Sequence, residues 1–559
     1  MSKVIGRTEG DGTVRLQFRN SFGENIFRAK YANSETQTWS EKAALIVDDV
    51  TENLMPQDAK DELTKFISDF KFMPGGRYIY YAGRVASFFN NCYLLRGEED
   101  TREEWGALTQ RSSDCLMSGG GIGIDYSVFR PHGAPLGRTG GTASGPIPLM
   151  HTINELGRNV MQGGSRRSAI YASLNWQHGD AEAFLQAKDW GSMEIAKGLT
   201  YKDAKEANFN AHAPLDMTNI SLNYDNAFLD RIQNGQLPPT FIENVRQALK
   251  SGEPGFSFNF GDKENETLRN ACTEVTSADD SDVCNLGSIN MGAIGTLDEF
   301  RAVVRLASGF LVCGTITADL PYDKVYEVRK KNRRLGLGLM GMHEWLLKRG
   351  YQYEMVPELQ QWLEVYREES ERAANSLCDK LSISRPVAYR AIAPTGTIGI
   401  LAGTTTGIEP LFAVAYKRRY LQGAKNWKYE YVVDSTAQAI IEETGCDPTK
   451  IETSLSLVND ADRRIKFQAD VQDYVDMAIS STINLPAWGT EHNNEEGVEQ
   501  FARTLAKYAP RLRGFTVYPD GSRGGQPLNL CTYKEAMKHK GVVFEENGDE
   551  QCGSGVCGI

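Results

Sequence analysis

The alternation of short apolar runs with long amphipathic segments is the feature that most narrows the choice of fold. After residue 290, the apolar AVVRLASGFLVCGTITA is followed by the long PELQQWLEVYREESERAANSLCDKL, whose apolar residues have helical spacing. Residues 145–163 and the segment AEAFLQAKDW have the same spacing, whereas FMPGGRYIYYAG joins a turn signal to an aromatic, β-prone run. Such alternation favours an α/β architecture.

The segment NACTE at 270–274 concentrates side chains with useful chemistry. On an extended backbone alternate side chains share a face, so we expect Asn270, Cys272 and Glu274 to point into one site. An amide, a thiol and a carboxylate can orient a substrate, donate or abstract hydrogen, and accept a proton. Cys284 follows twelve residues after Cys272, and this second thiol adds the option of two-electron redox chemistry.

Two glycine-containing segments are candidates for close contact with a ligand. Pro394, Thr395, Gly396 and Thr397 join a β-prone run to the start of a helix. Backbone N–H groups and threonine hydroxyls there suit a phosphate, although many strand-to-helix turns look similar and bind nothing. The glycines of 119–123 permit close backbone approach, but they lack the strand-before and helix-after context of a dinucleotide fingerprint.

The overall charge and the start of the chain restrict the partners. A net charge of −12 and a pI near 5.3 argue against nucleic acid or an anionic membrane as the main partner. No apolar run approaches the length of a transmembrane helix, and the start, MSKVIGRTEGDG, lacks an apolar signal core. We therefore expect a cytosolic protein without membrane spans.

The ten cysteines are too sparse in 559 residues for a disulfide scaffold. In a reducing compartment most should be buried thiols, and a lone cysteine such as Cys92 in FFNNCYLL is usually a core residue. Cys552 and Cys557 are different, because they sit in a glycine-rich terminus that we expect to be mobile. With no further ligands nearby for zinc, they favour a swinging dithiol, and we expect no metal site.

Together the motifs resemble the catalytic chain of ribonucleotide reductase of class II, which depends on adenosylcobalamin. The resemblance covers about residues 70 to 559, and the motifs share their order along the chain: FMPGGR, FNNCYLL, GGGIGIDYSVFRPHG, GGSRRSA, FLQAK, NIS, NACTE, CNLGSIN, RRLGLGLMG, APTGTIGI, TTGIEPLF, STINLP, TVYPDGSR and the terminal CxxxxC. It implies an α/β barrel of ten strands in two five-stranded half-sheets. A central finger loop would carry Cys272 at its tip, which departs from the strand expected above.

The resemblance also implies roles for the singled-out residues. Cys272 would become the thiyl radical that abstracts the 3′ hydrogen of a ribonucleotide. Glu274 would accept the proton of the 3′-hydroxyl, and Asn270 would hold the ribose hydroxyls. Cys92 and Cys284 would form the reducing pair, one protonating the departing 2′-hydroxyl and both ending as a disulfide.

The remaining implied roles concern turnover and substrate binding. Cys552 and Cys557 would reduce the internal disulfide by exchange, and thioredoxin or glutaredoxin would reset them. Pro394–Thr397 would cradle the phosphates of a ribonucleoside di- or triphosphate, with Asn91 and Gly121 lining the site. Adenosylcobalamin would supply the radical chemistry that side chains lack.

An allosteric site is also implied. Asp100 and Arg130 match positions of a site that binds a dNTP or ATP effector and selects among substrates. The polar stretch 190–217 falls where the family has its specificity loop, and it is too long for an ordinary connection. Effector sites of this kind usually form at a dimer interface, so a homodimer is one expectation.

The main alternative is a class I large subunit, which needs a separate metal-radical subunit. That class uses adjacent tyrosines late in the chain, whereas the only such pair here is Tyr80-Tyr81. A non-catalytic nucleotide-binding relative is a second alternative, but the catalytic and redox positions are retained.

The expected domains are a short N-terminal region (1–70), the catalytic barrel (71–530) and a flexible redox tail (531–559). The N-terminal region is too short for an ATP-cone, so we expect no on/off control by dATP.

Overall fold

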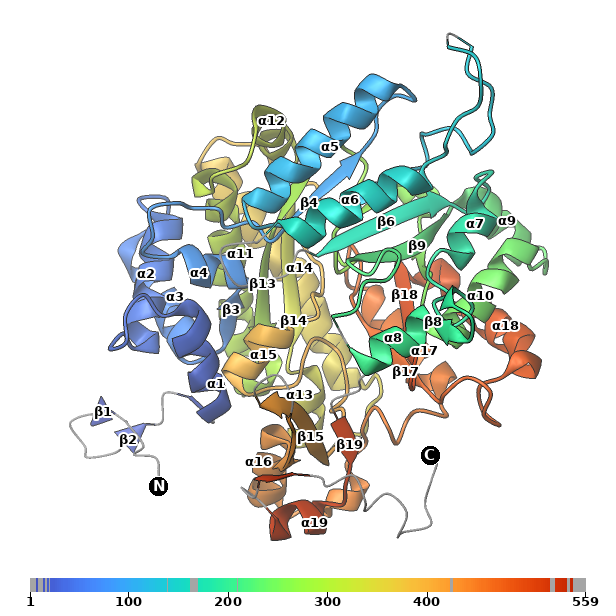
Figure 1. Ribbon diagram of the computed structural model, residues 1–559. Helices are drawn as coiled ribbons and strands as arrows, with labels where there is room; N and C mark the ends of the chain where they lie inside the picture. Colours follow the sequence, from blue (N-terminus) through green and yellow to red (C-terminus); the bar gives the residue numbers. More distant parts are fainter. Residues whose placement is uncertain are drawn as a thin grey trace.

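The structure is a computed structural model that describes the chain apart from residues 1–6, 9–13, 16–17, 20, 138, 161–168, 209, 423–425, 523–527, 540–542 and 546–559. The expected redox dithiol, Cys552 and Cys557, therefore lies outside the described residues. Figure 1 shows a central sheet flanked by helices, with a small second sheet beyond one end of it.

The central sheet has ten strands. Nine follow the order β14-β13-β4-β5-β6-β9-β10-β18-β17, and β3 pairs with β13 off this path. The strands β5 and β14, the latter with the apolar sequence LGLGLM, are buried along their whole length, as expected for strands covered on both faces. The bounds are β3 (Phe72–Pro74), β4 (Cys92–Arg96), β5 (Gly121–Asp125), β6 (Ile170–Asn175), β9 (Thr218–Tyr224), β10 (Gly255–Phe258), β13 (Asp282–Asn290), β14 (Leu335–Met340), β17 (Thr482–Leu485) and β18 (Gly514–Pro519).

The strand directions divide this sheet into two groups. In the first group β4, β5, β6, β9 and β10 run parallel to one another. The second group consists of two parallel pairs, β13 with β14 and β17 with β18. The groups meet in antiparallel pairs, β13 with β4 and β10 with β18. Single parallel bridges, Leu337 with Arg390 and Ile392 with Ile479, connect β14 through residues 388–392 to the segment before β17.

Helices connect the parallel strands, which confirms the α/β alternation expected from the sequence. Polar residues cap several of them; the Thr101 hydroxyl, for example, accepts a hydrogen bond from the Glu104 amide at 3.1 Å before α5. The helices of this layer are α5 (Arg102–Met117), α6 (Ile147–Asn159), α7 (Ala181–Gln186), α9 (Asn226–Gln233), α10 (Pro239–Ser251), α11 (Leu297–Thr317), α12 (Asp323–Asn332), α13 (Met342–Lys348), α14 (Pro357–Lys380), α15 (Gly396–Ala402), α17 (Ala461–Gln472) and α18 (Val498–Tyr508).

Among the described helices, α11 alone is long and apolar enough to cross a membrane by length and composition. Of its most apolar window, 72% is buried inside the protein, and the helix packs against α14, α2 and β13. These are the properties of a helix in the core of the fold.

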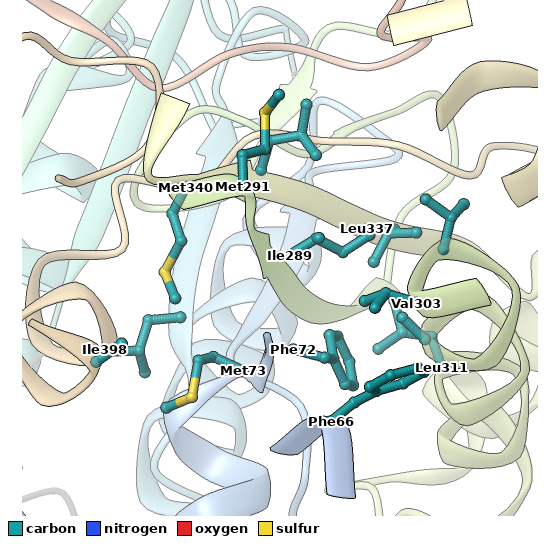
Figure 2. Packing of buried hydrophobic residues seen from close by; sticks show 14 of the residues in the cluster. Phe66, Phe72, Met73, Ile289, Met291, Val303, Leu311, Leu337, Met340 and Ile398 are labelled. Atoms are coloured by element: carbon teal, nitrogen blue, oxygen red, sulfur yellow. The ribbon is translucent and has the colours of Figure 1, made fainter. Parts of the chain in front are cut away.

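The N-terminal region shares its core with the central sheet. Buried residues of the first seventy, such as Phe66, pack in one cluster with Phe72, Ile289 and Leu311 (Figure 2). The β-prone reading of RYIYYAG is wrong, because Gly76–Tyr81 forms a helix whose Tyr78 and Ile79 are fully buried. The bounds here are β1 (Arg7–Thr8), β2 (Val14–Arg15), α1 (Ser21–Ile26), the π-helix η1 (Phe27–Tyr31), α2 (Trp39–Thr51), α3 (Gln57–Ser68) and α4 (Gly76–Tyr81).

A small four-stranded sheet, β19-β15-β16-β20, forms a separate layer (Figure 1). The expected boundary at 530 differs from the structure, because α19 and β20 continue this layer beyond it. Ala536 of α19 is fully buried and packs in one cluster with Ala415 and Val433. The bounds are β15 (Ala415–Gln422), β16 (Asn426–Val433), α16 (Ser435–Thr444), β19 (Leu528–Leu530), α19 (Tyr533–Lys538) and β20 (Val543–Glu545).

The described part of the polar stretch 190–217, which omits residue 209, contains regular elements and is not a plain loop. It contains a two-stranded sheet and a short helix, and its Asp216 forms ion pairs with Arg158 of α6 and, at 3.0 Å, with Lys205. The elements of this stretch are β7 (Glu194–Ala196), β8 (Leu199–Thr200) and α8 (Tyr201–Ala207). The remaining short elements are η2 (Gly261–Lys263), β11 (Leu268–Arg269), β12 (Thr276–Ser277), η3 (Met291–Ala293), η4 (Pro448–Lys450), η5 (Glu495–Gly497) and η6 (Ala509–Arg511).

Candidate active site

The NACTE segment forms the tip of a hairpin made by the antiparallel strands β11 and β12. The expectation of a single extended strand is therefore wrong: the Thr273 amide donates to the Asn270 carbonyl at 3.0 Å, and Thr273 has a φ of 73°. The side-chain oxygen of Asn270 also accepts a hydrogen bond from the Val275 amide at 3.0 Å. Asn270 thus closes the turn that presents Cys272.

This hairpin is packed between strands of both groups of the sheet. On one side a Cβ on Gly123 of β5 would lie only 1.7 Å from the Arg269 carbonyl oxygen. On the other side the Ala478 amide donates to the Glu274 carbonyl at 2.8 Å. The glycine in GIGID is needed for this close approach, which fixes the depth of the tip.

A cavity of about 310 Å³ opens beside the hairpin tip. It brings together nine residues singled out from the sequence: Asn91, Cys92, Gly121, Cys272, Glu274, Pro394, Thr395, Gly396 and Thr397. They come from the beginning of β4 and the residue before it, from β5, from the hairpin, and from the turn and first residues of α15, segments that are far apart in sequence. Asn270 reaches the same place, because its side-chain amide donates to the Cys92 sulfur at 3.5 Å.

Glu274 has the properties of a proton acceptor held away from water. Its side chain is 1% exposed, and its Oε2 has no hydrogen-bond partner among the described residues. Burial raises the pKa of Glu274 to about 7, opposed by weaker contributions from its own backbone amide and the Asn270 side chain. A carboxyl group with this pKa can accept a proton near neutral pH.

Cys92 and Cys284 lie directly opposite each other in neighbouring strands. They are paired in the antiparallel register of β4 with β13. Opposed residues in such a ladder have Cα atoms about 4.5–5.5 Å apart, within the range that a disulfide requires. Cys92 is buried beside the cavity. The structure describes the backbone of Cys284 but not its side chain.

The turn before α15 presents threonine hydroxyls and backbone amides to the cavity. Thr395 adopts a left-handed conformation with φ 52°, and its hydroxyl accepts a hydrogen bond from the Gly407 amide at 2.8 Å. Pro394 and Gly396 are exposed, and Thr397 is partly buried. The turn is thus held from behind, and its front is open to a ligand.

The two residues expected at an effector site lie together but outside this cavity. Arg130 and Asp100 form an ion pair at 2.6 Å, and each side chain is about one third exposed. Neither residue is among those that line the cavity.

Sequence reasoning missed part of the cavity wall. Tyr31, Gly75, Gly76 and Ser288 also line it. Gly75 is required there, because a Cβ would lie 2.4 Å from the Asn91 side chain. The turn signal PGG could have indicated the two glycines. No sequence motif indicates Tyr31, which reaches the cavity wall through tertiary packing.

Comparison with known proteins connects this geometry to a family. Residues 90–251, 245–364 and 384–517 match the family described as "Ribonucleotide reductase, barrel domain", which covers more than half of the chain. The chain belongs to this family of ribonucleotide reductases.

Two ribonucleotide reductases illustrate the similarity. The "Vitamin B12-dependent ribonucleoside-diphosphate reductase" of Mycobacterium tuberculosis (strain ATCC 25618 / H37Rv) is 25% identical, over 87% of this chain and 74% of that protein. The "Putative adenosylcobalamin-dependent ribonucleoside-triphosphate reductase" of Mycobacterium phage D29 is 27% identical, over 82% of this chain and 75% of that protein.

Among solved structures, the "Actinobacillus ureae class Id ribonucleotide reductase alpha subunit" superposes with a TM-score of 0.69. It covers 89% of this chain and 97% of that chain at 16% identity. At that identity the likeness establishes the α/β ribonucleotide reductase fold and nothing finer.

Proposed function

We propose that this chain is the catalytic chain of an adenosylcobalamin-dependent ribonucleotide reductase that removes the ribose 2′-hydroxyl to make deoxyribonucleotides. The observation that carries the proposal is one cavity lined by two thiols, Cys92 and Cys272, and by Glu274, a buried carboxyl with a pKa of about 7. Cys284 is the residue paired with Cys92 in the neighbouring strand. Similarity to vitamin B12-dependent relatives over most of the chain supports the choice of cofactor.

Each side chain has a role that its surroundings suit. Cys272, as a thiyl radical, abstracts the 3′ hydrogen and returns it to C3′ at the end of the cycle. Glu274 accepts the proton of the 3′-hydroxyl and gives it back when that hydroxyl is restored. Asn270 holds the ribose hydroxyls and orients Cys92. The thiols of Cys92 and Cys284 together give two electrons and two hydrogens: the 2′-hydroxyl leaves as water, and the sulfurs are left joined as a disulfide.

The cofactor chemistry fits the residues present. Adenosylcobalamin, when bound, supplies the radical chemistry that ordinary side chains lack. Cys272 suits it, because this thiol is only partly buried and lines the open cavity rather than the core. By contrast Cys115, Cys313 and Cys378 are enclosed in the core.

The proposed fold is a closed barrel of two five-stranded half-sheets around a finger loop. The antiparallel pairs between the two groups and the bridges through residues 388–392 support closure. The finger is the hairpin of β11 and β12, whose contacts to Gly123 and Ala478 come from opposite groups.

Substrate binding is proposed at the turn Pro394–Thr397, which would cradle a di- or triphosphate, while Asn91 and Gly121 contact the nucleotide. Asp100 and Arg130 would belong to a dNTP or ATP effector site at a homodimer interface.

By function, the proposed parts are the N-terminal region (1–70), the catalytic barrel with the small sheet that includes α19 and β20, and a redox tail that carries Cys552 and Cys557. Cys552 and Cys557 would carry electrons from thioredoxin or glutaredoxin to the internal pair, in the cytosol.

An anaerobic assay on the purified protein tests this proposal. With adenosylcobalamin and a dithiol, we expect reduction of CDP or CTP and no need for a second protein. Cys272→Ser should abolish reduction and leave nucleotide binding unchanged, whereas Cys446→Ser, a partly buried cysteine outside the cavity, should behave as wild type. Reduction without adenosylcobalamin would overturn the cofactor choice, and turnover by Cys272→Ser would overturn the radical assignment.

A further inference from the structure

We propose that the N-terminal segment, Arg19 to Tyr31, completes the phosphate end of the active site. In this proposal Tyr31 contacts the terminal phosphate of the substrate, and Arg19 is a positioning residue that holds α15. The inference rests on the proposed function of the turn Pro394–Thr397. The segment precedes residue 90, where the match to the family begins.

Tyr31 is placed where a phosphate group would sit. It lines the cavity together with Thr395, Gly396 and Thr397. Its hydroxyl faces Gly76, where an added Cβ would lie 3.0 Å from the Tyr31 oxygen. A glycine at position 76 therefore leaves room for the Tyr31 hydroxyl at the cavity wall.

The backbone conformation that positions Tyr31 is unusual. Phe27–Tyr31 is a π-helix, a rare conformation that often marks functional sites. Phe27 is fully buried against Trp39, with ring centroids 5.7 Å apart, so the last residue of the π-helix is set on a fixed base. Tyr31 itself is 7% exposed.

The composition of the cavity wall makes a tyrosine hydroxyl important for binding a phosphate. Among the described residues that line it, none is Lys or Arg, and Glu274 is the one ionisable carboxyl. A phosphate bound there would depend on neutral donors, namely hydroxyls and backbone N–H groups. Hydrogen bonds to a charged acceptor are about twice as strong as neutral ones, so each such donor contributes measurably.

Arg19 ties the same segment to the far end of the phosphate helix. Its guanidinium donates to the carbonyl of Gly403, which ends α15, at 2.8 Å and to Glu344 at 2.7 Å. The α1 helix also packs directly on α15 (Figure 1), since a Cβ on Gly23 would lie 2.9 Å from the Leu401 carbonyl oxygen. The segment thus contacts α15 at its end, while Tyr31 lines the same cavity as the first residues of α15.

Glu344 makes this anchor rigid. It is 2% exposed, accepts a hydrogen bond from Thr404 at 2.6 Å, and forms a second ion pair with Lys348 at 2.9 Å. Thr436 adds a further hydrogen bond to the Gly403 carbonyl at 3.1 Å. Movement of Arg19 would therefore disturb a network that connects α13, the end of α15 and α16.

The contact of Tyr31 is tested by varying the ligand and the hydroxyl together. Equilibrium binding of cytidine, CDP and CTP is measured for wild type, Tyr31→Phe and the control Tyr80→Phe, whose residue lies outside the cavity. We expect Tyr31→Phe to weaken CDP or CTP binding about tenfold, the loss of one hydrogen bond to a charged group, and to leave cytidine binding unchanged. Equal weakening of cytidine, or no change for any ligand, would overturn the contact.

Arg19 is tested by kinetics rather than by stability. Arg19→Ala should raise KM for the nucleotide at least fivefold with kcat within about twofold, and Arg19→Lys should restore part of the loss. Thermal unfolding is recorded in parallel. A lowered melting temperature with unchanged KM would show that Arg19 only stabilises the fold.

Thr397→Val separates this inference from the proposed function. If it weakens CDP binding and Tyr31→Phe does not, the phosphate turn stands and the N-terminal contact is wrong. If neither variant changes CDP binding, the phosphate site itself is misassigned.

Discussion

At the scale of single residues, the proposed base Glu274, with a pKa of about 7, should make activity dependent on pH. The carboxyl must be ionised to accept a proton, so kcat should rise as pH increases through about 7. Glu274→Gln should lower kcat by roughly 10²–10⁴-fold, the usual contribution of a general base, and remove this rise. The measurement is a pH–rate profile under saturating substrate.

The same residue makes a prediction about stability. Because its folded pKa is raised from 4.5 to about 7, the folded chain binds more protons than the unfolded one between these values. The free energy of unfolding should therefore fall as pH rises through this window. At pH 8 Glu274→Gln should be more stable than wild type by on the order of 2 kcal/mol, and below pH 4.5 the difference should vanish.

Glu182→Gln, at an exposed position of α7, is the matched control and should change neither profile. An unchanged pH–rate profile in Glu274→Gln would exclude it as the base.

Short sequence motifs predicted which residues are reactive, but they did not predict what surrounds those residues. Cys272, Glu274 and the turn at Thr395 stand in short motifs, and the structure brings them to one cavity. Neither the raised pKa of Glu274 nor the presence of Tyr31 was predictable, because both arise from packing between segments distant in sequence. Cys284 could be paired with Cys92 only through the family resemblance; the strand register now gives a physical reason.

At the scale of elements, the hairpin of β11 and β12 depends on glycine in the strand beneath it. Gly123→Ala would place a methyl group 1.7 Å from the Arg269 carbonyl, and backbone cannot move aside as a flexible side chain can. We expect a loss of about 3 kcal/mol in unfolding free energy. We also expect at least a tenfold loss of kcat, since small misplacements of a reacting group are costly.

Gly106→Ala is the control, because a Cβ at this position in α5 meets nothing within 4 Å. It should stabilise the protein by up to about 1 kcal/mol through helix propensity. Equal stability of the two alanine variants would mean that the hairpin is not held against β5.

The sequence predicted the type of element correctly where the periodic segment was long, and incorrectly where the segment was short. The helical spacing of 145–163 and of the long PELQQ segment corresponds to α6 and α14. The aromatic run after Gly76 forms α4 instead of a strand, because burial of Tyr78 and Ile79 outweighs β propensity. The NACTE segment turns because β11 and β12 pair on either side of it.

At the scale of the whole molecule, Cys92 of the proposed reducing pair is out of reach of a protein reductant. Cys92 is 6% exposed, and the cavity beside it has a volume of about 310 Å³, far too small to admit another folded protein. Electrons must therefore arrive on a flexible segment or a small molecule. We propose that Cys552 and Cys557, which stand in a glycine-rich sequence, carry these electrons.

Replacing Cys552 and Cys557 together with serine separates these two routes. With thioredoxin as reductant, we expect the variant to make about one deoxyribonucleotide per chain and then stop, because the disulfide between Cys92 and Cys284 stays oxidised. A small dithiol such as dithiothreitol should restore repeated turnover, since it can enter the cavity. The control is Cys446→Ser with Cys531→Ser, two partly buried cysteines outside the cavity, which should keep the full thioredoxin-dependent rate. If the tail variant also kept that rate, electrons would reach the buried pair by a path that does not involve the terminus, and the long-range relay would have to be abandoned while the chemistry at Cys272 could still stand.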